Sequence, residues 1–183
     1  MKDHLKVSNI KISCSLHLDK NEPFFLNKDV KCTNYSNFTL VRNQFVYTFF
    51  KSKNNHSVYH VNITKIPSKK QVCQALNNIK NLVGAKFCLK NWRKENITCS
   101  LDIKRQIPLF SLYEPLQSQK FVKKLSFNPD RFPAMFVGTK HNTVLIFSTG
   151  KMVIIGGKSV KRALLSAKLI VNFLNLYKPK HYN

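Results

Sequence analysis

Residues 143–159, TVLIFSTGKMVIIGGKS, place the strongest constraint on the fold of this chain. They alternate as two short strands around a Ser-Thr-Gly-Lys turn, with large apolar side chains on both faces of each strand. In the first strand, Val144 and Ile146 point away from Leu145 and Phe147. A strand of a half-solvated antiparallel sheet is apolar on one face only. Something other than water must therefore cover the second face.

The charge of the chain points to a polyanionic partner. Its 183 residues include 31 Lys and Arg against 8 Asp and Glu, a formal net charge of +23. Nucleic acid is the first candidate partner and an anionic membrane surface the second. No apolar run approaches the roughly 20 residues of a membrane span, and the N-terminal residues lack the apolar core of a signal peptide. We therefore expect a protein that is not secreted.

The residues that could carry chemistry form no recognisable site. Five cysteines, an odd number, contain no C-x-x-C pair and indicate reduced thiols. The six histidines show no metal-ligand spacing, the acidic residues form no convincing pair, and no phosphate-binding Gly-rich loop is present. We expect no enzymatic activity, no catalytic residue, no metal, no cofactor and no small-molecule substrate.

An internal repeat organises the chain. Residues 7–16, VSNIKISCSL, resemble residues 94–103, KENITCSLDI, and both alternate with period two. Placing Asn9 on Asn96 gives an offset of 96 − 9 = 87.

The helical segments repeat as well. Residues 68–83 and 159–174 each begin with Ser and carry one apolar stripe, at an offset of 159 − 68 = 91. Between strand and helix, SNFTLV at 36–41 matches DRFPAM at 130–135. The sequence thus predicts two similar halves, 1–88 and 89–183. One long helix per half covers one face of a sheet and leaves the other face without a helix.

Two stretches of the second half resemble the TATA-box-binding protein family. FNPDRFPAMF at 127–136 is similar to the family's Pro-x-x-Phe-Pro motif, and residues 143–159 are similar to its Leu-Ile-Phe-Ser-Ser-Gly-Lys stretch. The resemblance covers about residues 94–177 and is weaker over about 6–83. It implies an α+β saddle made of a pseudo-twofold pair of halves. In such a saddle a curved antiparallel sheet of about ten strands carries its helices on the convex face.

The resemblance also implies a function. Members of this family are general transcription initiation factors that bind A·T-rich promoter DNA in the minor groove and bend it with inserted Phe side chains. They recruit a transcription factor IIB-like factor and RNA polymerase. The minor groove distinguishes A·T from G·C but little else, so shape-matched apolar contacts suit it. DNA would then cover the second face of the strands, with no membrane involved.

Carried onto the second half, the resemblance makes Phe132 and Phe147 the wedge pair, with Pro133 stiffening the approach to Phe132. Leu145 and Val153 are implied as contacts to the groove floor. Without the motif, both Phe residues would fit a buried core as well.

In the first half, the resemblance implies Phe38 as one wedge. Phe50 is the second wedge, with Phe49 as the alternative if the register slips by one residue. Asn9 and Asn96 match a pair of asparagines at the central base pairs, where short amides can donate to A N3 or T O2.

The remaining matches lie beside these positions. Thr64 matches a family threonine, and its partner position is Ile155 here. Lys151 and Lys158 match lysines that contact phosphates.

Some positions depart from the family pattern. Lys11, Thr98 and Asn62 stand where the family has valine, which makes the sheet more polar. The acidic residues that would face a basal factor are reduced to Asp130 beside Arg131.

Two alternatives to promoter binding stay open. The first is a module of the same fold that has lost specific DNA binding and binds an acidic protein instead. The second is an accessory domain like those that precede catalytic domains in some DNA glycosylases and ribonucleases H, and we expect no such domain after the last helix. For an initiation factor we expect the nucleus, or a cytoplasmic viral factory if the chain is viral.

Overall fold

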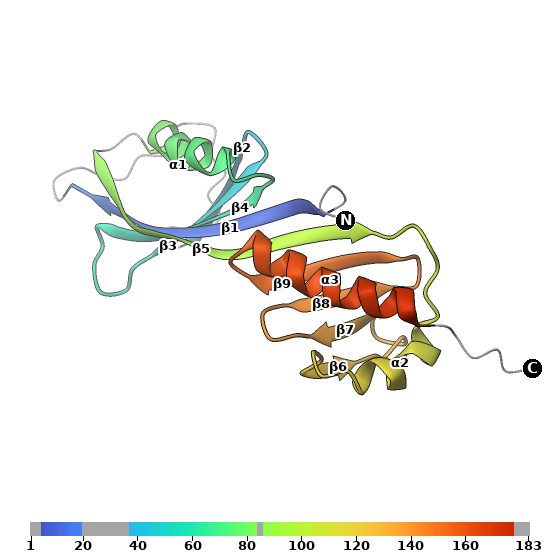
Figure 1. The fold of residues 1–183 in the computed structure, drawn as a ribbon. Helices are drawn as coiled ribbons and strands as arrows, with labels where there is room; N and C mark the ends of the chain where they lie inside the picture. The colour runs from blue at the N-terminus through green and yellow to red at the C-terminus, as the bar shows by residue number, and fades with distance from the viewer. Residues whose placement is uncertain (1–4, 20–36, 84–85, 178–183) are drawn as a thin grey trace, which may run out of the picture. The chain divides into compact units, whose positions relative to one another are not determined.

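The computed structural model describes residues 5–19, 37–83 and 86–177 (Figure 1). Contacts divide the chain into two units. The N-terminal unit is Ser8–Glu95, and the C-terminal unit is Asn96–Asn183 together with Met1–Val7. The division falls inside one long strand, β5 (Phe87–Asp102), which contributes residues to both units.

The N-terminal unit is an antiparallel sheet with one helix. Its strands follow the order β2-β3-β4-β1-β5. The elements besides β5 are β1 (Lys6–Leu18), β2 (Asn37–Arg42), β3 (Phe45–Lys51), β4 (Val58–Ile66) and α1 (Gln71–Leu82). Helix α1 lies across one face of this sheet (Figure 1).

Alternation along the strands forms the core under α1. Ile10, Ile12, Cys14 and Leu16 of β1 are buried, and the residues that alternate with them point to the other face. The hydroxyl of Tyr47 donates a hydrogen bond of 3.0 Å to the carbonyl of Ala75 on α1. The face that carries Tyr47 is therefore the one that α1 covers.

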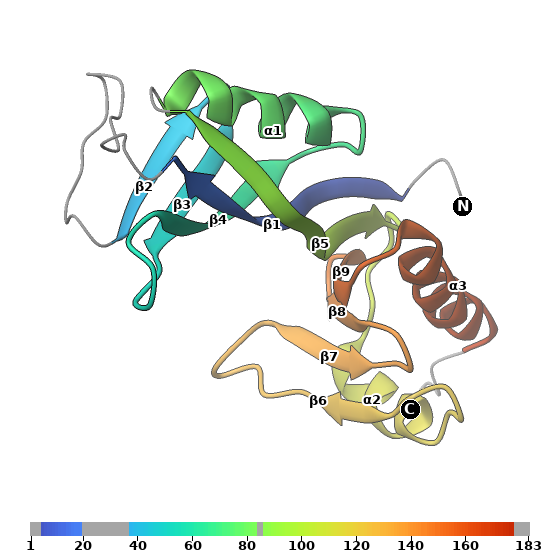
Figure 2. The ribbon, with the colours of Figure 1, turned by 90° about the vertical axis from the view of Figure 1, so that its left-hand side faces the viewer.

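The C-terminal unit repeats this plan with two helices. Its strands follow the order β5-β9-β8-β7-β6. The elements are α2 (Leu109–Gln117), β6 (Lys124–Ser126), β7 (Ala134–Gly138), β8 (Thr143–Phe147), β9 (Lys151–Gly157) and α3 (Val160–Leu176). Figure 2 shows α3 against one side of β8 and β9. Over the described residues the sheet has nine strands, against the about ten that the resemblance implied.

The core of the C-terminal unit lies between the sheet and α3. Ile146 and Ile154 of the sheet are fully buried, as are Ala163 and Ala167 of α3, whose small side chains allow the helix to approach the strands closely. The predicted turn between β8 and β9 is confirmed. Gly150 has φ 88° and its N–H donates to the carbonyl of Phe147 at 3.0 Å.

The strand registers of the two units match. A row of paired residues crosses each sheet on its helix side, Ile12–Ile63–Tyr47–Leu40 in the N-terminal unit and Cys99–Ile154–Val144–Val137 in the C-terminal unit. In both units a β-bulge interrupts the pairing of the first strand, between Ile10 and Ile12 and between Ile97 and Cys99. The rows therefore identify equivalent positions in the two units.

Candidate nucleic-acid interface

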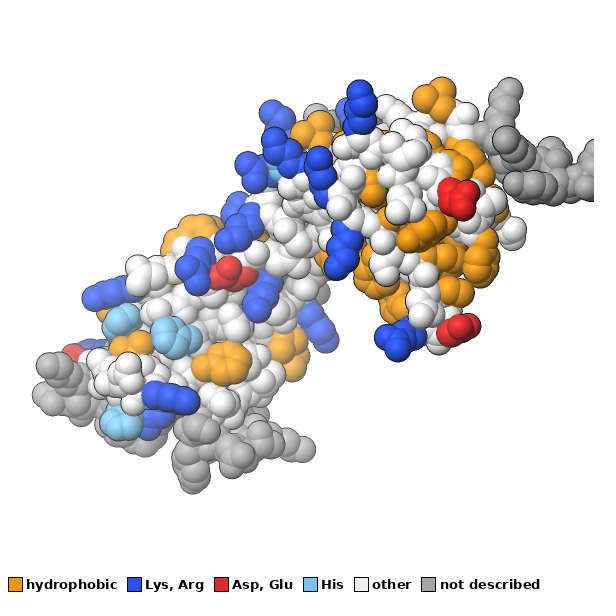
Figure 3. All heavy atoms as spheres, turned by 90° about the horizontal axis from the view of Figure 1, so that it is seen from below, with side chains coloured by type: hydrophobic (Ala, Val, Ile, Leu, Met, Phe, Trp, Pro, Cys, Tyr) orange, Lys and Arg blue, Asp and Glu red, His pale blue; other side chains and the backbone are white. Residues whose placement is uncertain are grey.

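Each sheet has one face that is turned away from its long helix, which we call the distal face. In the C-terminal unit an apolar row crosses this face. Val153 of β9 pairs with Leu145 of β8, which pairs with Phe136 of β7. Val153 and Phe136 are partly exposed and Leu145 is 9% exposed, although their neighbours on the helix side are fully buried. In Figure 3, apolar side chains gather over much of the C-terminal unit.

A cluster of three phenylalanines extends this row. The ring of Phe132 lies 6.1 Å from that of Phe147 and 5.4 Å from that of Phe136, measured between centroids. Phe132 is 40% exposed, and Pro133 beside it is also exposed. Neither Phe132 nor Phe147 lies under α3. The structure thus brings the two predicted wedge residues together on the distal face.

Phe136 is the member of the cluster that sequence reasoning missed. It belongs to the FPAMFVG segment, where alternation from Ala134 places it on the distal face. That alternation was the available signal.

The predicted cations flank the row. Lys151 at the start of β9 is exposed, and so is Lys158 just after its end. Ile155 is partly exposed and pairs with Thr143.

The two predicted asparagines occupy equivalent positions and make equivalent bonds. The Oδ1 atom of Asn9 accepts from the N–H of Lys65 at 2.8 Å, and that of Asn96 accepts from the N–H of Gly156 at 3.1 Å. Both donors lie at positive φ, 58° and 81° respectively. Because Oδ1 accepts this bond, the orientation of each amide is fixed, and its Nδ2 donor points away from the N–H that Oδ1 accepts from. The Nδ2 of Asn96 lies 3.5 Å from the hydroxyl of Thr98.

The distal face of the N-terminal unit is polar where that of the C-terminal unit is apolar. By the matched registers, Asn62, Thr48 and Thr39 occupy the positions of Val153, Leu145 and Phe136. The hydroxyls of Thr39 and Thr48 lie 3.3 Å apart and are hydrogen-bonded.

A pocket of about 450 Å³ opens on this polar face. It is lined by Lys11, Ser13, Cys14, Ser15, His60, Asn62, Asn91, Arg93 and Glu95. Glu95 holds one wall together, since it accepts from Ser13 Oγ at 2.6 Å and forms an ion pair with Arg93. Lys, Arg and His side chains are visible on the side of the N-terminal unit opposite α1 (Figure 3). Thr64 lies on the same face, partly exposed and paired with Val46.

The position expected for Phe38 is corrected by the structure. Phe38 is 5% exposed, stacks on Phe49 at 4.6 Å and shares the helix-covered face with it. Its equivalent in the other unit is Met135, since Phe38 pairs with Phe49 as Met135 pairs with Ile146. Phe38 is therefore a core residue of the N-terminal unit.

Phe50 lies on the distal face, and Phe49 does not. Phe50 is 37% exposed and occupies the position equivalent to Phe147. The register of β3 thus separates the two residues that the sequence left as alternatives.

Comparisons of the sequence and of the structure with known proteins both find TATA-box-binding proteins. Residues 91–177 match the family model described as "Transcription factor TFIID (or TATA-binding protein, TBP)". The TATA-box-binding proteins of Sulfolobus acidocaldarius and Sulfurisphaera tokodaii are each 28% identical over 85 residues, which is 45% of this chain. The C-terminal part of the chain, residues 91–177, is similar to the TATA-box-binding protein family.

Structural similarity to the family extends beyond the sequence match. The structure of Methanococcus jannaschii TBP matches with a TM-score of 0.65 and 18% identity, covering 95% of this chain and 99% of that one. This likeness establishes the TBP fold for both units and confirms the predicted α+β class. The sequence match to the two curated TBPs spans 40% of their length, and the family model matches residues 91–177 of this chain.

The remaining chemistry of the TBP-like chain is sparse. Within residues 5–19, 37–83 and 86–177, no group of three His, Cys, Asp or Glu side chains is arranged to hold a metal ion. Of the helices in those ranges, none is long and apolar enough to cross a membrane.

Burial raises the pKa of the Cys14 thiol to about 11 and raises that of Cys99 as well. Both thiols are thereby kept in the unreactive protonated form.

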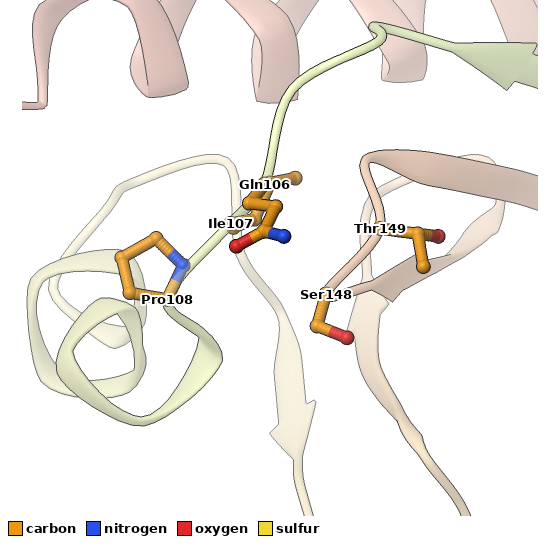
Figure 4. A pocket seen from close by; sticks show the side chains of 5 residues that line it. All are labelled: Gln106, Ile107, Pro108, Ser148 and Thr149. Carbon is orange, nitrogen blue, oxygen red and sulfur yellow. The ribbon is translucent and has the colours of Figure 1, made fainter.

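A second pocket lies in the C-terminal unit, beside the turn between β8 and β9. Its volume is about 330 Å³, and Figure 4 shows the side chains of Gln106, Ile107, Pro108, Ser148 and Thr149 around it. The N–H of Ile107 donates to the carbonyl of Ser148 at 2.8 Å and joins the two walls. All five side chains are neutral, so this pocket offers no acid, base or ion-binding group.

Proposed function

We propose that this TBP-like chain is a transcription initiation factor that binds A·T-rich promoter DNA in the minor groove. Its contacts come from the distal faces of the two sheets. Phe132 and Phe147 insert between base steps and bend the duplex, and Phe50 acts in the same way from the N-terminal unit.

The observation that carries the proposal is the apolar row Val153–Leu145–Phe136, which continues into Phe132 and Phe147 on the distal face. A·T pairs expose only acceptors in the minor groove, and G·C pairs add the amino group of guanine. An apolar surface can lie against an A·T floor without burying an unpaired donor. Inserted Phe rings cost a few kcal/mol per unstacked step, and the contacts that the bend permits offset this cost.

Electrostatics supports the same partner. The net charge of +23 attracts the phosphates, and exposed Lys151 and Lys158 flank the apolar row. Each phosphate neutralised releases counterions, so affinity falls steeply as salt rises.

The proposal includes a place in the transcription machinery. Similarity to the TBP family supports docking of a transcription factor IIB-like factor and RNA polymerase on the protein–DNA complex. It also supports action in the nucleus, or in a cytoplasmic factory for a viral chain.

A second candidate function is a TBP-fold interaction module that has lost specific DNA binding. It is favoured by Lys11, Asn62 and Thr98, which are polar and lie on the distal faces. On this account an acidic protein occupies the polar face. Competition separates the two functions, because an acidic partner that binds equally well with DNA present does not use the distal face.

Base analogues test the minor-groove proposal directly. Inosine·C pairs resemble G·C in the major groove but lack the guanine amino group in the minor groove. Gel-shift titrations should give similar affinities for an A·T-rich duplex and its inosine·C counterpart, and a clearly weaker one for G·C. Inosine·C behaving like G·C would place the readout in the major groove. Equal binding of all three would leave only phosphate contacts.

A further inference from the structure

The distal faces of the two units differ at matched positions, and this difference bears on sequence preference. Val153, Leu145 and Phe136 in the C-terminal unit correspond to Asn62, Thr48 and Thr39 in the N-terminal unit. Three consecutive strands thus carry apolar side chains in one unit and hydrogen-bonding side chains in the other.

The two rows differ in whether they offer hydrogen-bond acceptors to the base edges in the minor groove. The apolar row has no side-chain acceptor, so a guanine amino group placed against it would be buried without a partner. The polar row offers the Oδ1 of Asn62 and the hydroxyl oxygens of the two threonines as acceptors. The amide of Asn62 also carries a donor, so it can meet A N3 or T O2 when the pair is A·T.

The pocket on the N-terminal unit adds to this tolerance. Its volume of about 450 Å³ and its polar walls, including Ser13 and Ser15, can hold water that bridges side chains to base edges. Ser13 Oγ donates to Glu95, which leaves its oxygen lone pairs as acceptors. A guanine amino group on this side can be satisfied directly or through water.

We propose that the DNA site of this protein is composite. The half-site under the C-terminal unit must be A·T, whereas the half-site under the N-terminal unit accepts G·C as well. The proposal rests on the minor-groove function proposed above, and it names the determinant as the polar row Asn62–Thr48–Thr39.

The base 2,6-diaminopurine isolates the group that matters. Replacing adenine by this base adds the minor-groove amino group of guanine and leaves the major-groove pattern of adenine unchanged. Three duplexes of one A·T-rich sequence are needed, namely unmodified, with diaminopurine in one half-site, and with diaminopurine in both. The full chain can bind the second duplex in the orientation that places its N-terminal unit, and so the polar row, over the modified half-site.

Equilibrium titration of the three duplexes tests the idea. Modification of one half-site should change the Kd less than about twofold, and modification of both should weaken binding about tenfold or more, the usual effect of a buried unpaired donor. The double variant Asn62→Val with Thr48→Leu copies the apolar residues into the N-terminal unit. With its own Kd for the unmodified duplex as the reference, this variant should bind the half-modified duplex about tenfold more weakly. Asn172→Val, an exposed position on α3, is the matched control and should change neither value.

The outcomes are separable. Wild-type protein that loses as much on the half-modified duplex as on the fully modified one overturns the composite site but leaves minor-groove binding intact. A double variant that retains full affinity for the half-modified duplex overturns the assignment to this row. Failure of the wild type to bind even the unmodified duplex would reject the proposed function itself.

Discussion

Asn96 fixes the backbone of the neighbouring strand by accepting a hydrogen bond from the N–H of Gly156 at 3.1 Å. Asn9 makes the equivalent bond to Lys65 in the other unit. Each bond spans a bulge whose donor residue has a positive φ. The asparagines therefore have a structural role in addition to any contact with DNA, and the same bond orients their amides on the distal face.

Removing either asparagine should destabilise its unit. Asn96→Ala or Asn9→Ala leaves a backbone N–H without its acceptor, so each should lower the free energy of unfolding by about 1 kcal/mol. Urea denaturation followed by circular dichroism measures the change. Asn172→Ala on the exposed side of α3 serves as the control and should have little effect. Equal stability of all three variants would show that the two bonds contribute nothing.

Two glycines with positive φ should respond differently to a methyl group. A Cβ at Gly156 meets no described atom within 4 Å, so Gly156→Ala should cost only the left-handed conformation, about 1–2 kcal/mol. A Cβ at Gly150 would overlap the carbonyl oxygen of Arg105, so Gly150→Ala should cost about 3 kcal/mol or more. Thermal unfolding of the two variants gives the comparison. A smaller loss for Gly150→Ala would contradict the packing of this turn on the segment before α2.

Lys65 occupies the position of Gly156 in the other unit, at φ 58°. Relief of this conformation is worth about 1–2 kcal/mol, while glycine elsewhere in a strand costs about 0.5–1 kcal/mol. Lys65→Gly should therefore leave stability unchanged or slightly higher. Lys51→Gly in the extended strand β3 is the matched substitution and should lower it. Similar losses in both variants would argue against a strained Lys65.

The cysteines should differ in reactivity. Cys73 and Cys88 are exposed, whereas Cys14 and Cys99 are buried and have pKa values raised by burial. A raised pKa leaves less thiolate at a given pH, so the buried pair should react slowly with iodoacetamide at pH 8. Mass spectrometry of the native protein should find Cys73 and Cys88 modified before Cys14 and Cys99, and these four all modified after unfolding. Rapid labelling of Cys14 would show that the core of the N-terminal unit opens readily.

Local patterns predicted the strands and the tight turn because those signals come from neighbouring residues. Alternation in residues 7–16 and the Gly-Lys pair after Phe147 each need only a few residues. The offset of 87 between Asn9 and Asn96 also describes the equivalent strands of the structure.

The face of Phe38 required long-range information. Matching Phe38 to Phe132 assumed an offset of 132 − 38 = 94, whereas the next strand, from Phe50 to Phe147, has an offset of 147 − 50 = 97. Phe38 pairs with Phe49 as Met135 pairs with Ile146, so the first strand of the hairpin has the offset of 97 as well. An offset of 97 makes Phe38 the equivalent of Met135, which is a core residue. Matching one aromatic to another concealed this three-residue shift.

The composite character of the distal faces was only partly visible in the sequence. Lys11 and Asn62 were recognised as polar departures. The correspondence of Thr48 with Leu145 and of Thr39 with Phe136 depends on pairing across several strands. No local pattern contains that pairing.

Bending of an A·T-rich duplex tests the central claim most directly. Fluorescence energy transfer between dyes at the two DNA ends should rise when the wild-type protein binds, because kinking brings the ends together. The double variant Phe132→Ala with Phe147→Ala should give a much smaller rise at saturating protein, while Phe110→Ala, which removes a 75% exposed ring from α2, should bend DNA as the wild type does. A double variant that bends the duplex as far as the wild type would contradict insertion of these two side chains.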